Sequence, residues 1–165
     1  MNTIQRIIGI AAVFSVAVVV NTQTASSQET LASKLKKAKW DAIIGTWVDP
    51  ETKGKKMTTS YEWKIKDQVV EINTKDNDLE STALMGVNGK TGDIFHMGAD
   101  SSGTSSLGNW SVGSNGDAVL GFVYTTATGQ EGMLSIRQRF QDKDTLQVTI
   151  ELPQPIKYSL VRKSK

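Results

Sequence analysis

The chain has 165 residues, of which 19 are Lys or Arg, 17 are Asp or Glu and one is histidine, for a formal net charge of +2. The absence of cysteine excludes disulfides, thiol nucleophiles and zinc–thiolate sites. The charges are interspersed along the chain. Because phosphate binding needs a clustered positive face, we expect no nucleic-acid partner.

The first part of the chain has the organisation of a secretory signal peptide, which we place at residues 1–27. Arg6 is the single charge before an apolar run over residues 7–20, and polar or small residues follow as far as Ser27. The apolar run is shorter than a membrane span, which requires about 20 residues. We therefore expect cleavage before Gln28 and export to the periplasm or the extracellular space, without stable membrane insertion afterwards. A retained membrane anchor is the alternative.

Residues 28–40 are predicted to form a short capping helix or a linker. Leu31 and Leu35 lie one helical turn apart, with Trp40 beyond them, and lysines occupy much of the remaining segment. A helix with a solvated lysine face that caps the following domain is the favoured interpretation, because the apolar stripe is short. A basic amphipathic segment on an anionic membrane surface is the alternative.

From residue 43 onward the hydrophobic period changes to two. In residues 57–66, odd-numbered positions share one face and even-numbered positions the other, as in a half-buried antiparallel strand. Later strands are expected at residues 69–74, 81–87, 93–99, 104–112, 119–125, 133–140, 146–152 and 157–162. Short strands at regular spacing, with no long helix between them, predict an antiparallel up-and-down β-barrel of about 8–10 strands over residues 41–165. Closing such a meander removes its two exposed edges.

A glycine two residues before a tryptophan opens the first expected strand. In Gly45-Thr46-Trp47 the glycine lets the backbone bend, so the indole ring can lie across one end of the barrel. A similar triplet, Gly108-Asn109-Trp110, recurs midway along the chain. The last strand ends at Arg162 and could pair with the strand that carries Trp47. We therefore predict that Trp47 closes one end of the barrel.

The position of Gly45-Thr46-Trp47, after a short helix and before a β-meander, resembles lipocalin-like (calycin-type) barrels. It is similar above all to small exported bacterial domains with phrases like Ile94-Phe95-His96 and Leu160-Val161-Arg162-Lys163. The resemblance implies that the tryptophan closes the barrel floor and that Arg162 packs over its ring. The threonine–aspartate motif and the disulfide of a typical lipocalin are not present, so the resemblance implies a barrel with room for a small molecule but no particular ligand.

Large side chains on the expected inner face are candidates for a ligand-binding wall. The predicted lining residues are Tyr61, Trp63, Met85, Met97, Trp110 and Tyr124, with Phe122 and Met133 as further members. A barrel of this size can hold one small, hydrophobic ligand. The alternative is that these side chains simply fill the interior.

Few residues suggest catalysis or metal binding. His96 is the sole histidine, and in an extended strand it points away from the neighbouring Met97. Asp76, Asp78 and Glu80 alternate like calcium ligands, but the segment lacks the central glycine and the length of an EF-hand loop. The sequence contains no Gly-x-Ser-x-Gly elbow, P-loop or dinucleotide fingerprint. We therefore expect no catalytic residue, no metal and no cofactor.

Three classes of function remain open from the sequence. The leading hypothesis is an exported, non-enzymatic module that binds an apolar or amphipathic small molecule inside the barrel. The second is a structural or protein-interaction domain with a filled core, and the sequence does not indicate the protein partner. The third and weakest is an enzyme that uses His96 and neighbouring carboxylates.

Overall fold

A computed structural model of the protein describes residues 29–113 and 116–164, so the predicted signal peptide, residues 1–27, lies outside the described residues. The described chain begins with one short helix, α1 (Leu31–Lys37), and one turn of 3₁₀ helix, η1 (Asp41–Ile43). Its strands are β1 (Gly45–Val48), β2 (Met57–Ile65), β3 (Val69–Asp76), β4 (Leu79–Val87), β5 (Ile94–Asp100), β6 (Ser105–Val112), β7 (Asp117–Thr125), β8 (Glu131–Phe140), β9 (Thr145–Ile150) and β10 (Ile156–Arg162).

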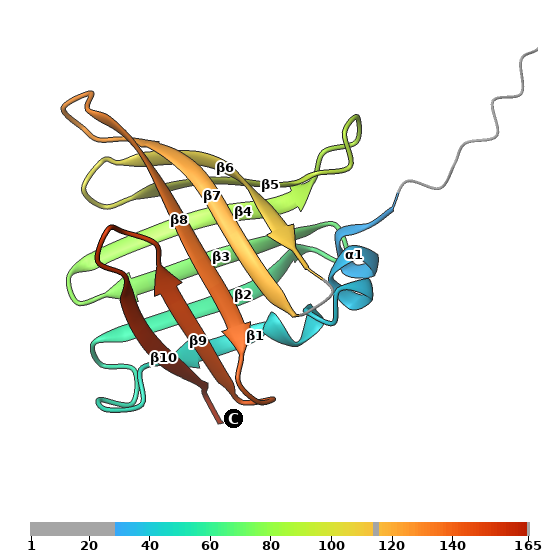
Figure 1. Cartoon of the computed structure of the whole chain (residues 1–165), viewed down its shortest axis with the longest axis horizontal. Helices are drawn as coiled ribbons and strands as arrows, with labels where there is room; N and C mark the ends of the chain where they lie inside the picture. Colours follow the sequence, from blue (N-terminus) through green and yellow to red (C-terminus); the bar gives the residue numbers. More distant parts are fainter. Residues whose placement is uncertain (1–28, 114–115, 165) are drawn as a thin grey trace, which may run out of the picture.

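The ten strands of the described ranges close into one antiparallel barrel (Figure 1). Each strand pairs with its neighbours in sequence, and β1 completes the ring by pairing with β10, where Trp47 lies opposite Arg162. The amide of Lys163 donates to the carbonyl of Thr46 at 2.8 Å and extends this seam. The fold confirms the predicted all-β, up-and-down barrel preceded by a short helix.

The two ends of the barrel are built differently. At the closed end, α1 lies beside the connections 66–68 and 88–93, and the connection 141–144 belongs to the same end (Figure 1). The opposite, open end carries the connections 49–56, 77–78, 101–104, 126–130 and 151–155.

Helix α1 is held in place by the barrel. It has only 7 residues, too few for a stable isolated helix, and the hydroxyl of Thr30 caps its first turn by accepting from the Ser33 amide at 3.2 Å. Leu31 and Leu35 are buried in the core of the barrel, which uses up the apolar stripe of the helix. The lysines remain on the outer side, as the capping interpretation requires. In residues 29–113 and 116–164, no helix has the length and apolarity to span a membrane.

Candidate functional site in the barrel interior

The closed end is sealed by Trp47 and Arg162. Trp47 is fully buried and its indole N–H donates to the Ile43 carbonyl at 2.8 Å. The guanidinium carbon of Arg162 lies 4.3 Å from the centre of the Trp47 ring, a cation–π geometry. Arg162 also donates to the backbone carbonyls of Ala42 and Ile44, so it ties the chain before β1 to the end of β10.

Gly45 makes this arrangement possible. Its φ is +133°, a region that side chains rarely tolerate. A Cβ atom at this position would stand 2.8 Å from Nη1 of Arg162. The glycine of the Gly-x-Trp triplet is therefore needed both for the backbone bend and for the approach of the guanidinium group.

Packed aromatic rings fill the closed half of the interior. Trp40, between α1 and η1, has its ring centre 5.6 Å from that of Trp110, 6.1 Å from that of Phe140 and 6.4 Å from that of Tyr61. The Tyr61 hydroxyl lies 2.9 Å from Nε2 and 3.1 Å from Oε1 of Gln138, and burial raises the pKa of Tyr61 well above its usual value. This layer forms the floor beneath the open part of the barrel.

Above the floor, the interior contains a cavity of about 410 Å³. Residues from every described strand except β1 line it. Tyr61, Trp110 and Gln138 belong to the deep part of the wall, and Tyr124 and Tyr158 to the part nearer the open end. The volume is within the range of sites that enclose a small organic molecule.

The predicted lining residues lie in three places: the cavity wall, the core and the outer surface. Tyr61, Trp110 and Tyr124 do line the cavity, as does Phe122. Met85 is completely buried in the core but does not reach the cavity, and Trp63 packs half-buried against that core.

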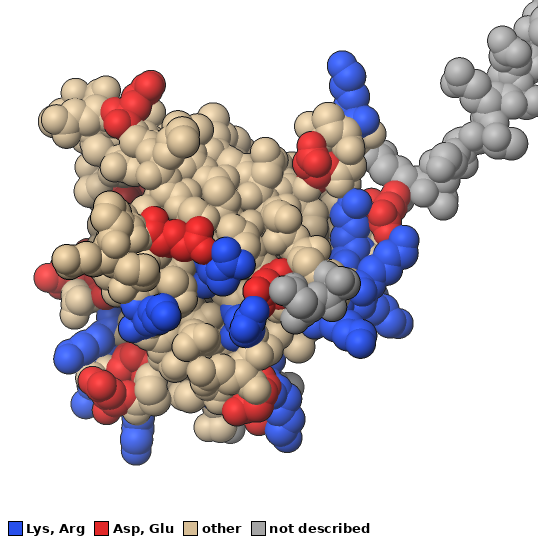
Figure 2. Space-filling model, in the orientation of Figure 1, with Lys and Arg blue, Asp and Glu red and all other residues tan. Residues whose placement is uncertain are grey.

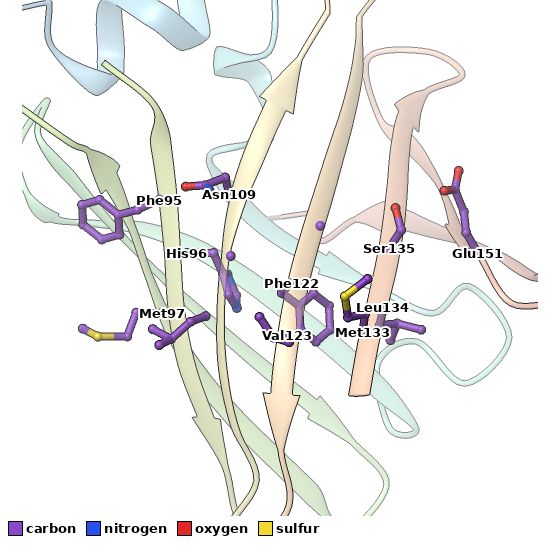
Figure 3. A pocket seen from close by; sticks show the side chains of 13 residues that line it. Phe95, His96, Met97, Asn109, Phe122, Val123, Met133, Leu134, Ser135 and Glu151 are labelled. Carbon is purple, nitrogen blue, oxygen red and sulfur yellow. The ribbon is translucent and has the colours of Figure 1, made fainter. Parts of the chain in front are cut away.

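Met97 and Met133 are on the outer surface, which corrects their predicted place in the wall. Met97 is 50% exposed and Met133 is 83% exposed. The cause is the alternation of the strand: His96 faces inward in β5, so Met97 must face outward. Figure 3 shows Phe95 and Met97 on the side of β5 away from His96.

His96 is a polar group in an otherwise aromatic part of the wall. Its ring centre is 5.9 Å from that of Phe122 and 6.3 Å from that of Trp110, and its Nε2 lies 3.2 Å from the Ser106 hydroxyl oxygen. Nδ1 is buried without a hydrogen-bond partner in the described structure. Burial lowers the pKa of His96 to about 4, so the imidazole is neutral at pH 7. Among the residues described, no group of three or more His, Asp or Glu side chains could hold a metal ion.

Sequence reasoning missed the polar residues of the cavity wall. Asp76, Asp100, Ser106 and Tyr158 all line it. Asp76 could have been found by continuing the period of two from Ile72, past the point where the apolar residues stop. Burial, together with the negative charge of Asp76, raises the pKa of Tyr158 to about 12, so this phenol stays protonated.

A second concavity, of about 920 Å³, lies on the outside of the same wall (Figure 3). An exposed apolar row crosses four adjacent strands there, because Met97 pairs with Leu107, Leu107 with Val123 and Val123 with Met133. We call these four residues the outer row. Gly121 leaves open space beside the row, since nothing lies within 4 Å of where its Cβ would be. In Figure 2 the face over β5–β8 has few charged side chains.

The two concavities suit different kinds of partner. The inner cavity is surrounded by strands on all sides and can bury most of a small ligand. The outer groove is larger but open, and an exposed apolar surface of this kind is typical of contacts with macromolecules. The inner cavity is therefore the candidate small-molecule site.

No known protein-family model matches the chain, and no curated protein was found to be similar to it. The geometry of the barrel is therefore the basis for assigning a function.

Proposed function

We propose that the protein is an exported, non-enzymatic binding module that holds a small apolar or amphipathic molecule inside a lipocalin-like barrel. The observation that carries the proposal is the cavity of about 410 Å³ between the aromatic floor and the open end. A filled core would have left no such space. The signal-like segment at residues 1–27 supports export.

The polar groups of the wall suit binding better than catalysis at neutral pH. A general base works best when its pKa is near the working pH, and the pKa of His96 is about 4. Its partner in the described structure is the hydroxyl of Ser106 rather than a carboxylate that would raise its basicity. His96 is therefore placed to give a neutral hydrogen bond to a ligand.

A pair of substitutions on adjacent residues tests the proposal. Ser106→Phe puts a ring into the cavity, whereas Leu107→Phe puts the same ring on the outer face of β6. Binding of a neutral hydrophobic dye, N-phenyl-naphthylamine, is measured by fluorescence titration, with circular dichroism as a check of folding. We expect at least about 10-fold weaker dye binding in Ser106→Phe and little change in Leu107→Phe. Equal binding by both variants, or no dye uptake by the unaltered protein, would refute the proposal.

The outer row favours a second candidate function, a protein-interaction domain. Leu107 is 59% exposed in the middle of the row, a large apolar side chain with no cover in the described structure. Leu107→Asp places a charge there without touching the cavity. Loss of association by this variant in sedimentation experiments, in a protein that takes up no dye, would favour the interaction domain over the binding module.

A further inference from the structure

The charged side chains that line the cavity are all negative among the described residues. Asp76 at the end of β3 and Asp100 at the end of β5 belong to its wall, and no Lys or Arg of the described chain does. Neither carboxylate forms an ion pair within the described structure. By contrast, nearby Glu80 pairs with Lys75 at 3.0 Å and Glu151 pairs with Arg137 at 2.7 Å. The negative charge at the cavity is thus not neutralised by the protein.

Local hydrogen bonds hold these two carboxyl groups in position but bring no opposite charge to them. Oδ1 of Asp100 accepts from the amides of Ser102 and Thr104, at 2.9 Å and 3.0 Å, and these bonds help to lower the pKa of Asp100. Oδ1 of Asp76 accepts from the side-chain amide of Asn77 at 3.0 Å. Asp100 therefore stays anionic at neutral pH, and both carboxyl groups are held beside the cavity opening.

The surrounding rim has the same sign. We define the rim as residues 49–56, 76–80, 100–104, 125–131 and 150–157. It contains eight Asp or Glu residues against four lysines. Lysines instead gather on and after α1 at the other end of the barrel, where Figure 2 shows a cluster of positive side chains. A field of this direction draws cations toward the cavity opening and repels anions.

Within the described ranges, the cavity wall has aromatic faces but no cationic side chain that could hold an anionic head group. His96 is uncharged at pH 7 because burial lowers its pKa to about 4. The rings of Trp110, Phe122, Tyr124 and Tyr158 line the cavity, and aromatic faces attract organic cations. Trp110 is only 6% exposed and its indole N–H has no partner in the described structure, so the deep wall also retains one donor for a ligand.

We propose that the ligand is a cationic amphiphile, an organic amine or quaternary ammonium compound with an apolar body. Its head group lies at the rim between Asp76 and Asp100, and its apolar body extends toward Trp110. The inference rests on the proposed binding function and narrows it to one charge class.

Three probes with the same alkyl chain separate the charge classes. Decyltrimethylammonium, decanol and decyl sulfate, each below its micelle concentration, are titrated against the protein carrying N-phenyl-naphthylamine, at low and high salt. We expect the ammonium compound to displace the dye at about 10-fold lower concentration than the sulfate, with decanol between them. Because the preference is electrostatic, salt should reduce it.

Asp76→Asn tests the assignment to the cavity wall. The change removes one charge and keeps the size and the hydrogen-bonding capacity of the side chain. We expect the preference for ammonium over sulfate to fall by about 2- to 5-fold, while decanol binds as before and thereby shows that the cavity is intact. Asp78→Asn, two residues further on in the same hairpin, is the matched control, because Asp78 does not line the cavity.

The outcomes distinguish this inference from the function on which it rests. Displacement of the dye by all three probes alike, or best by the sulfate, would overturn the cationic ligand and leave the binding function standing. An equal loss of preference in Asp76→Asn and Asp78→Asn would overturn the contact at the cavity wall. If the protein took up neither the dye nor any of the three probes, the proposed binding function itself would be refuted.

Discussion

The closed and open ends of the barrel use their residues in opposite ways. At the closed end, buried rings pack against α1. Arg162 donates hydrogen bonds to backbone carbonyls there, and its guanidinium group lies over the Trp47 ring. At the open end, Asp76 and Asp100 border a cavity without an ion pair among the described residues. The comparison indicates that one end supplies most of the stability, and the other is left free to contact a ligand.

The largest expected effect is the difference in stability between removing an aromatic ring at the closed end and removing one at the open end. Trp47→Ala removes a fully buried indole and leaves a void beneath Arg162, which should lower the free energy of unfolding by about 3–5 kcal/mol. Tyr124→Ala at the cavity wall should cost far less, because Tyr124 is only partly buried and already borders empty space. Urea denaturation monitored by circular dichroism measures both. Similar losses for the two variants would break the distinction between the ends.

The next largest effect is expected when acid protonates His96, which lies at the boundary between the aromatic floor and the cavity. The folded-state pKa of His96, about 4, lies below its ordinary value of 6.5, so the unfolded chain binds this proton more readily. The contribution of neutral His96 to the free energy of unfolding is therefore fully present above pH 6.5. It falls as the pH drops from 6.5 toward 4, and then levels off. The loss should be up to about 3 kcal/mol.

The difference between the protein and His96→Gln isolates this contribution, since several carboxylates titrate in the same range. Unfolding free energies of both proteins are compared between pH 7 and pH 4. The acid-induced loss should be smaller in His96→Gln by roughly the histidine contribution. Parallel curves would show that His96 is not desolvated in solution as its position in the wall requires.

The sequence predicted the closed end better than the open end for a physical reason. Closing a barrel requires a bent backbone and a large buried ring, and Gly45 with Trp47 displays both locally. Which face of β5 points inward depends instead on the whole ring of strands. Met97 was predicted to line the cavity because it is large and apolar, yet in the closed barrel it faces outward and His96 faces the cavity.

The cavity wall was harder to recognise because it is partly polar. Sequence patterns identify an inner face by its apolar residues, and the wall departs from that rule at Asp76, Asp100 and Ser106. In the sequence Asp76 is notable only as one of three alternating acidic residues, and its hydrogen bond with Asn77 is local. The period of two from Ile72 gives the face of the strand on which Asp76 lies, but the empty space beside that face depends on the curvature of the whole sheet.

A smaller effect is expected from a substitution that removes the charge of Arg162 but keeps a long side chain. Arg162→Met keeps an unbranched apolar stem over Trp47 but removes the cation–π contact and the bonds to Ala42 and Ile44. We expect a loss of about 1–2 kcal/mol in the free energy of unfolding. Lys163→Met is the matched control at the exposed neighbouring position and should change little. Dye binding should persist in Arg162→Met, because Arg162 does not line the cavity; its loss would mean that the ends are coupled.

The smallest expected effect is on the outer wall. Met133 is 83% exposed at the end of the outer row, so Met133→Gln removes almost no buried apolar area. The free energy of unfolding should stay within about 0.5 kcal/mol of the unaltered protein. Dye binding should also be unchanged, because Met133 lies across the wall from the cavity. A clear gain or loss of stability that depends on protein concentration would show that the outer row is covered in solution, and that the open half of the barrel has a partner on its outside as well as room for a ligand within.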